Sequence, residues 1–161
     1  QVCTKQEAAV GVETTTFLIP GEKDSDAELD TMTKWVVKEL GPDVPMPFSA
    51  FHPDWKMMDT PPTPHATLLR ARQIALNNGV RYAYVGNVHD LDAESTYCHG
   101  CGARLLGRDW YVLSDWALTD DGHCSQCGEA CAGVFDGPIG PLEGTWGAKR
   151  LPVNMTARVN R

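Results

Sequence analysis

Cysteines are the residues of this 161-residue sequence whose type and spacing most clearly indicate chemistry. Four of the six form two C-x-x-C pairs, each followed by glycine: Cys98, Cys101, Cys124 and Cys127. Two thiolates separated by two residues can reach one ion while the backbone turns beneath them, and the glycine permits that turn. Four thiolates are the ligand set of a closed, tetrahedral structural zinc site. We therefore predict that these cysteines bind one structural zinc ion in a zinc-ribbon module.

The same four cysteines leave two alternatives, which are iron in a rubredoxin-like site and disulfide bonds. No N-terminal stretch reads as a signal peptide, so a metal is favoured over disulfide bridges. We interpret His99 and His123 as exposed neighbours of the ligands rather than as alternative ligands. We interpret Cys131 as a small buried thiol rather than a fifth ligand, and Cys3, which stands alone, as inert.

The acidic balance of the chain argues against a nucleic-acid-binding role. The formal net charge is −7, whereas nucleic-acid-binding proteins usually present a basic face. Between residues 96 and 136, Arg104 and Arg108 are outnumbered by six acidic residues. We interpret the late basic residues as a solvated tail; they are Lys149, Arg150, Arg158 and Arg161. No apolar run is long enough for a membrane span, so we expect neither a nucleic-acid nor a membrane partner, and a cytoplasmic location by default.

The elements that must position these residues follow from hydrophobic spacing and turn residues. We predict strands at 12–19, 44–51 and 80–85, and helices from a cap at Ser25 to Gly41 and from a cap at Thr63 to Gly79. This alternation of strands and helices is typical of right-handed βαβ units in a parallel sheet. The predicted fold class is therefore α/β, and a sheet this short is normally one part of something larger.

The composition divides the chain into three parts. Residues 1–95 form the α/β segment, and the polar stretch 87–97 connects it to the cysteines. Residues 96–136 form the zinc-ribbon-like module, in which Trp110 to Leu113 are predicted to be strand. Residues 137–161 are rich in glycine and proline and are predicted to be an extended C-terminal tail.

Several short segments, taken in order, resemble a known enzyme family. They are Thr14–Gly21 (TTTFLIPG), Asp24–Asp26, Phe51–Pro53, Tyr84–Asn87 and Trp146–Val153 (WGAKRLPV). Together with the cysteine module, they resemble the C-terminal half of radical S-adenosylmethionine enzymes of the pyruvate formate-lyase activating-enzyme type. The resemblance is closer to the subgroup in which a zinc-ribbon-like module follows the barrel and which is encoded beside Memo-type partner proteins.

The resemblance implies a partial radical S-adenosylmethionine barrel, with the cofactor lying across the carboxyl ends of the strands. Thr15, Phe17 and His52 would line that site, with His52 near the adenosine. The alternatives are plain sheet residues for Thr15 and Phe17, and for His52 a loop histidine held by a backbone carbonyl. The family binds its 4Fe–4S cluster through a C-x-x-x-C-x-x-C loop, which these 161 residues do not contain.

We therefore expect the C-terminal part of a larger radical S-adenosylmethionine enzyme. The parent would cleave S-adenosylmethionine reductively at its 4Fe–4S cluster and pass a radical to a substrate or a partner protein. This chain alone would carry the structural zinc and be catalytically silent. It would associate with the missing N-terminal half-barrel or with itself. The alternative is a non-enzymatic zinc-binding protein-interaction module.

Overall fold

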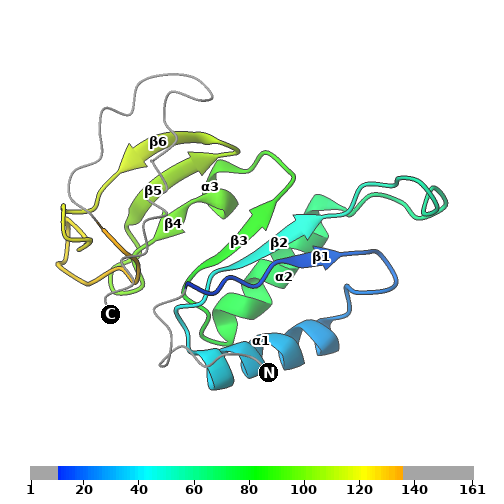
Figure 1. Ribbon diagram of the computed structural model, residues 1–161, viewed down its shortest axis with the longest axis horizontal. Helices are drawn as coiled ribbons and strands as arrows, with labels where there is room; N and C mark the ends of the chain where they lie inside the picture. The colour runs from blue at the N-terminus through cyan, green and yellow to red at the C-terminus, as the bar shows by residue number, and fades with distance from the viewer. Residues whose placement is uncertain (1–10, 136–161) are drawn as a thin grey trace, which may run out of the picture.

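The computed structural model describes residues 11–135 of the chain. Three predictions fall outside this range: the tail at 137–161 with its basic residues, the Trp146–Val153 segment and the isolated Cys3. The described residues form two sheets, a parallel one followed by an antiparallel one (Figure 1).

The first half is a three-stranded parallel sheet, in the order β1-β2-β3, whose strands alternate with helices. The elements are β1 (Thr16–Leu18), α1 (Asp26–Leu40), β2 (Met46–Ala50), α2 (His65–Asn77) and β3 (Ala83–Gly86). At the centre, Phe48 pairs with Thr16 on one side and Val85 on the other. The predicted α/β alternation is confirmed, although each strand is shorter than the apolar run that predicted it.

Helix α1 begins and ends where its sequence predicts. The Ser25 hydroxyl accepts a hydrogen bond from the Glu28 amide (3.4 Å), and Gly41 ends the helix at a φ of +93°. The Glu28 carboxylate pairs with Lys23 (3.2 Å), so Ser25 and Glu28 form only one of the two hydrogen bonds of a capping box. Leu29 and Val36 face inward and are buried in the core.

Helix α2 starts later than predicted, because Thr63 does not cap it. Its N-cap residue is Pro64, with no side-chain cap. The buried Thr63 hydroxyl instead accepts from the Phe51 amide (2.8 Å) and donates to the Leu18 carbonyl. It thus joins the ends of β1 and β2, a tertiary role that local sequence does not reveal. At the other end Gly79 has a φ of +95°, as predicted for the glycine after a helix.

The two helices are also joined to each other by a polar contact. The Asn78 side-chain amide, just after α2, donates to Asp30 Oδ1 (3.0 Å) and to the buried Thr33 hydroxyl (2.8 Å) on α1. A third, longer contact reaches the Asp30 carbonyl (3.4 Å). This amide therefore fixes the spacing of the helices beneath the sheet.

Both helices cover the same face of the parallel sheet (Figure 1). Leu18, Phe48 and Val85 point into that helix-covered core. Strand side chains alternate between faces, so the intervening residues Phe17 and Tyr84 point the other way. We call this second surface the open face, since neither α1 nor α2 covers it; Phe17 is 51% exposed there.

The second half is a small antiparallel sheet, in the order β4-β5-β6, that follows a one-turn helix. The elements are α3 (Leu91–Glu94), β4 (Thr96–Tyr97), β5 (Arg104–Asp109) and β6 (Val112–Trp116). The polar connector predicted at 87–97 contains α3 and β4, elements that its composition did not reveal. Strand was wrongly predicted at Trp110, which forms with Tyr111 the two-residue turn between β5 and β6.

Hydrogen bonding explains why this polar connector is ordered. Asp90 caps α3 by accepting from the Ala93 amide (2.9 Å). The buried Glu94 carboxylate accepts from the amides of Asp90 (3.0 Å) and Trp110. A polar residue can be buried when its hydrogen bonds are satisfied, and these partners are not evident from composition.

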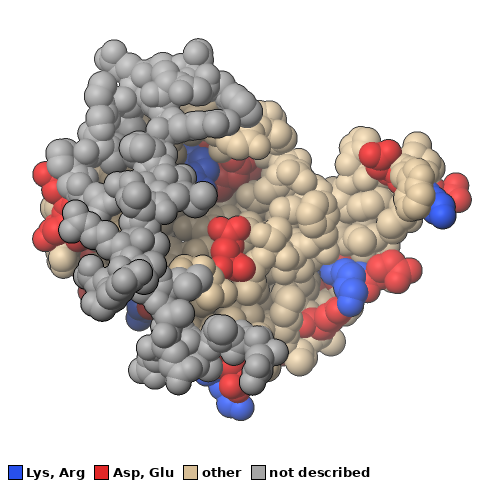
Figure 2. All heavy atoms as spheres, in the orientation of Figure 1, with Lys and Arg blue, Asp and Glu red and all other residues tan. Residues whose placement is uncertain are grey.

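Basic side chains are mostly neutralised on the described surface. Arg70 pairs with Asp26 (2.9 Å), Arg81 with Asp43 (3.0 Å), and Lys34 with Asp30. On the face shown in Figure 2, the visible Lys and Arg side chains lie near carboxylates and form no continuous basic surface. Among the described residues, no helix is both long and apolar enough to cross a membrane.

Candidate metal centre

The two C-x-x-C pairs converge on one point, as expected for ligands of a single ion. The four sulfur atoms, which we call the four-cysteine cluster, all lie within 4.8 Å of one another; they belong to Cys98, Cys101, Cys124 and Cys127. Two cross-pair distances are 3.6 Å (Cys98–Cys127) and 3.8 Å (Cys101–Cys124). Ligands about 2.3 Å from a tetrahedral zinc ion lie roughly 3.8 Å apart. The cluster is therefore consistent with a structural zinc site.

The two pairs have the same backbone conformation. In the first, the Cys98 amide donates to Ala103 (2.8 Å) and the Gly102 amide donates back to the Cys98 carbonyl (2.9 Å). In the second, the Cys124 amide donates to Glu129 (2.8 Å), and the Gly128 amide donates back to the Cys124 carbonyl (2.8 Å). The glycines have φ values of +75° and +76°, which residues with a side chain rarely adopt. The glycine after each pair is thus required by the turn.

The surroundings of the cluster prepare one cysteine to lose its proton first. The backbone amides of Cys127 and then Gln126 favour the Cys124 thiolate and lower its pKa to about 7. The Glu129 amide likewise lowers the pKa of Cys127. The neighbouring sulfur atoms and burial outweigh it and raise that pKa to about 12. Four thiolates this close repel one another, so a cation is needed to hold them all deprotonated.

The antiparallel sheet anchors the cluster on its inner side. Cys98 and Cys124 are buried and pack with Leu105 of β5 and Leu118, just beyond β6. An isolated bridge pairs Leu118 with Cys124. The other two cluster cysteines are exposed. One side of the cluster therefore rests on a small apolar core, and the other side faces outward.

The neighbouring candidate ligands lie outside the cluster. His99 Nε2 is 3.1 Å from Glu129, and His123 Nδ1 is 3.2 Å from Asp121. Cys131 is half-buried and accepts from the Tyr82 hydroxyl (3.5 Å), which also accepts from the Ala132 amide (3.0 Å). Desolvation raises the pKa of Cys131. This thiol thus links the second cysteine pair to the start of β3.

The residues expected near S-adenosylmethionine lie at one end and one face of the parallel sheet. Phe17 is exposed on the open face. Thr15 is exposed just before β1, and its hydroxyl donates to Glu13 (3.3 Å). His52 is also exposed and follows the carboxyl end of β2. Within residues 11–135, no hydrogen bond or ring contact joins His52 to the other two.

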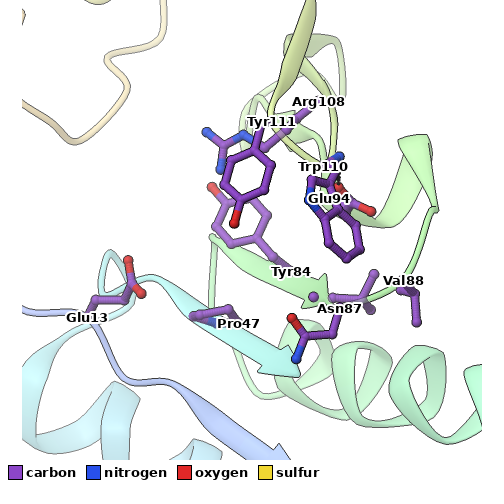
Figure 3. A pocket seen from close by; sticks show the side chains of 11 residues that line it. Glu13, Pro47, Tyr84, Asn87, Val88, Glu94, Arg108, Trp110 and Tyr111 are labelled. Atoms are coloured by element: carbon purple, nitrogen blue, oxygen red, sulfur yellow. Dashed lines mark hydrogen bonds between the residues drawn. The ribbon is translucent and has the colours of Figure 1, made fainter. Parts of the chain in front are cut away.

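A second candidate site, which sequence reasoning missed, lies between the open face and the β5–β6 turn. It is a hollow of about 240 Å³, and Tyr84, Glu94, Arg108 and Trp110 are among its lining residues (Figure 3). The sequence carries one signal for it, the adjacent aromatic residues at 110 and 111, but their pattern predicts a strand. As turn residues, they reach toward β3.

Comparison with known proteins gives a relative without assigning a family. A protein of Methanocaldococcus jannaschii, described as uncharacterized, is 39% identical to this chain over 127 residues. The match covers 77% of this chain but 38% of the relative, so this chain spans well under half of the relative's length. No protein-family model matches the chain, and no solved structure matches it significantly.

Proposed function

We propose that the chain is the C-terminal part of a radical S-adenosylmethionine enzyme that carries a structural zinc ribbon. The observation that carries the zinc assignment is the convergence of four sulfur atoms within 4.8 Å. With four protein ligands the site has no open position for a substrate, so the ion would stabilise the module rather than catalyse. The donor set therefore fits zinc in a structural role.

The radical-enzyme part of the proposal is supported by the open face and by the resemblance of the strand segments. In an α/β barrel, helices cover the outer surface and strand side chains fill or line the interior. Helices α1 and α2 cover one face, and Phe17 and Tyr84 point to the other. The open face would then be part of a barrel interior, with Thr15, Phe17 and His52 contacting S-adenosylmethionine.

The chain's own residues do not fit an iron–sulfur cluster of this family. Four of the five described cysteines belong to the four-cysteine cluster, and Cys131 contacts Tyr82. Three thiolates that leave one iron open would have to come from another polypeptide segment. In the parent enzyme, that cluster would supply the electron that cleaves the sulfonium of S-adenosylmethionine. The role of this chain would be to bind and orient the cofactor.

The decisive experiment joins this chain to the polypeptide encoded immediately upstream of it. We expect a C-x-x-x-C-x-x-C loop in that segment, and 5′-deoxyadenosine after anaerobic reconstitution and reduction. This chain alone, treated identically, should give none. An upstream segment without the three cysteines, or product from this chain alone, would refute the proposal.

Matched variants locate the cofactor contact within the joined protein. Phe17 on the open face and Trp35 on α1 are similarly exposed aromatic residues, at 51% and 47%. Phe17→Ala should raise the dissociation constant for S-adenosylmethionine about tenfold, because it removes a ring contact. Trp35 lies on the helix side of the sheet, so Trp35→Ala should leave the dissociation constant unchanged. Equal effects of the two substitutions would contradict the assigned face.

The proposal also requires a partner for the sheet. Strand β1 is an edge strand, and an edge presents unpaired backbone groups that another strand can complete. We propose that the complementary half-barrel, or in its absence a second copy of this chain, pairs with the unpaired edge of β1. Light scattering at micromolar concentration should therefore detect self-association of this chain, which mixing with the complementary half should reverse. A stable monomer would argue against a half-barrel.

One feature favours the alternative, a non-enzymatic protein-interaction module. The loop between β2 and α2 projects from the body of the molecule (Figure 1) and carries Trp55 and Met58, which are 79% and 65% exposed. Large exposed apolar residues in one loop can form a docking site. Absence of a three-cysteine segment upstream, combined with binding of another protein that is lost in Trp55→Ala, would favour this alternative.

A further inference from the structure

The hollow beside the β5–β6 turn has the size and position of a small-ligand site. Its walls come from the carboxyl end of β3, from β2, and from the β5–β6 turn (Figure 3). A volume of about 240 Å³ is slightly below the usual range of about 300–1,000 Å³ for ligand pockets. The hollow therefore suits a molecule smaller than a nucleotide.

One wall carries a cation that has no ionic partner within residues 11–135. Among the lysines and arginines of residues 11–135, Arg108 has no side-chain ion pair, hydrogen bond or ring contact. Arg104, on the same strand, pairs with Asp115 (2.7 Å) and Asp92 (3.5 Å). An unpaired guanidinium at the edge of a hollow is suited to bind a carboxylate of a ligand, because it can donate two parallel hydrogen bonds.

Two carboxylates line the hollow, and they differ in how many of their oxygens are already hydrogen-bonded. Glu94 is 6% exposed, and its two oxygens accept the amides of Asp90 and Trp110. Glu13 is exposed and comes from the segment before β1, on a different wall from Arg108 (Figure 3). Thr15 donates to one of its oxygens (3.3 Å), and within residues 11–135 the other oxygen has no hydrogen bond. A ligand here therefore meets a positive group on one wall and a negative group on another.

The space between these charges is bounded by apolar and aromatic side chains. Trp110 and Tyr84 line it together with Pro47 and Val88. The Tyr84 hydroxyl is bonded to Thr96 (3.0 Å), and burial raises its pKa. The Tyr84 side chain is therefore neutral and fixed in place, so its ring can pack against an apolar part of a ligand.

The Trp110 backbone is held in an unfavourable conformation at this place. Its φ is +56°, a region that costs a residue with a side chain roughly 1–2 kcal/mol. Two contacts maintain it, the bond from its amide to Glu94 and stacking of its ring on His89 at 5.0 Å. His89 is in turn bonded to Asp109 (2.8 Å). A positive φ is what the first residue of a two-residue hairpin turn requires, so the turn and these contacts together fix the Trp110 ring at the edge of the hollow.

We propose that this hollow binds a small zwitterion with an apolar body, the chemistry of a hydrophobic amino acid. Arg108 binds its carboxylate, Glu13 accepts from its ammonium group, and Trp110 packs against its side chain. The site goes beyond the proposed function, because none of its lining residues is among those assigned to S-adenosylmethionine. A plain anion is disfavoured by Glu13, and a plain cation by Arg108.

The test is an NMR titration of the full, zinc-loaded chain with three probes that share one body. Phenylalanine carries both charges, 3-phenylpropionate only the carboxylate, and phenethylamine only the ammonium group. The amides of Asn87, Val88 and Trp110 report binding, and that of Leu68 in the helix-covered core serves as reference. We expect saturable shifts with phenylalanine at millimolar concentration and weaker binding of both single-charge probes.

Substitutions of two arginines on one strand separate a specific contact from a general change of charge. Arg108→Gln should weaken phenylalanine binding about tenfold or more, whereas Arg104→Gln, with the same change of charge, should not. Both side chains lie at the surface, so both variants should keep the reference spectrum. No saturable shift with phenylalanine, equal binding of a single-charge probe, or unchanged binding by Arg108→Gln would overturn the proposal. The assay contains no S-adenosylmethionine, so its failure is distinct from failure of the proposed function.

Discussion

Replacing one cluster cysteine should unfold the antiparallel half of the molecule and leave the parallel half intact. Cys98 is buried at the inner side of the cluster, and Cys98→Ser removes one of its four sulfur ligands. The matched control is Cys131→Ser, because Cys131 lies outside the cluster and a serine hydroxyl can still accept from Tyr82. In each variant one sulfur atom is replaced by oxygen, so the two substitutions are chemically identical and differ only in position.

The expected size of the effect follows from how little apolar surface the module buries. Besides the cysteines, its fully buried apolar side chains among the described residues are Leu105 and Leu118, and the partly buried Leu106, Trp116 and Phe135 pack against them. Each contributes about 1.5–3 kcal/mol, so the pair supplies roughly 3–6 kcal/mol. A structural zinc ion contributes about 10–16 kcal/mol of apparent binding free energy at neutral pH. The ion is therefore a larger contribution than the two fully buried leucines, and the partly buried side chains close only part of the difference.

Zinc content and amide spectra measure the two halves separately. One zinc per chain is expected for the native protein and for Cys131→Ser, and substoichiometric zinc for Cys98→Ser. In that variant, or after chelation, the amides of Leu105 and Leu118 should lose their dispersed shifts while Leu29 and Leu68 keep theirs. Full zinc occupancy in Cys98→Ser, or a folded module after complete removal of the metal, would refute the reasoning.

Three other predictions concern pH, helix packing and a turn. Zinc affinity should fall by about tenfold or more for each pH unit below 7, because protons compete for Cys124, whose pKa is about 7; pH-independent affinity in a competition titration would contradict this. Asn78→Ala should lower the free energy of unfolding in urea by about 1–3 kcal/mol, because it removes the contacts to α1; an unchanged midpoint would show that these contacts contribute nothing. Gly122→Ala should destabilise the module more than Gly21→Ala destabilises its own turn. Both positions have positive φ, but a Cβ at Gly122 would lie 2.1 Å from the Phe135 ring while one at Gly21 meets nothing within 4 Å; equal losses of stability would contradict the steric argument.

The sequence predicted those parts of the fold whose causes are local. Ser25 and Gly41 bound α1 because a cap and a left-handed glycine act on adjacent backbone groups. Apolar runs located the three parallel strands, though they overestimated their lengths, because residues flanking a strand can be apolar without pairing. Thr63 was misassigned because its partners lie at the ends of two distant strands.

The candidate metal centre could also be predicted from the sequence, since ligand type and spacing suffice to propose four cysteines for one ion. The hollow could not be predicted from the sequence, because it is formed by segments far apart in the chain, from Glu13 to Trp110. Its most distinctive property, an arginine without a partner among the described residues, depends on where the carboxylates lie. Tertiary charge pairing of this kind leaves no local pattern in a sequence.

The strand pairings described above have a consequence for the order in which the chain acquires structure. In the parallel sheet, Thr16 pairs with Phe48, and Phe48 pairs with Val85, so each pairing joins residues that are far apart in the sequence. In the antiparallel sheet, Asp109 pairs with Val112 across a two-residue turn. Closing a short hairpin takes microseconds, whereas pairings between distant residues slow folding because the loop entropy is lost before the contacts form. In refolding from denaturant, the metal-binding half should therefore acquire protected amides first, and the parallel half should set the overall rate.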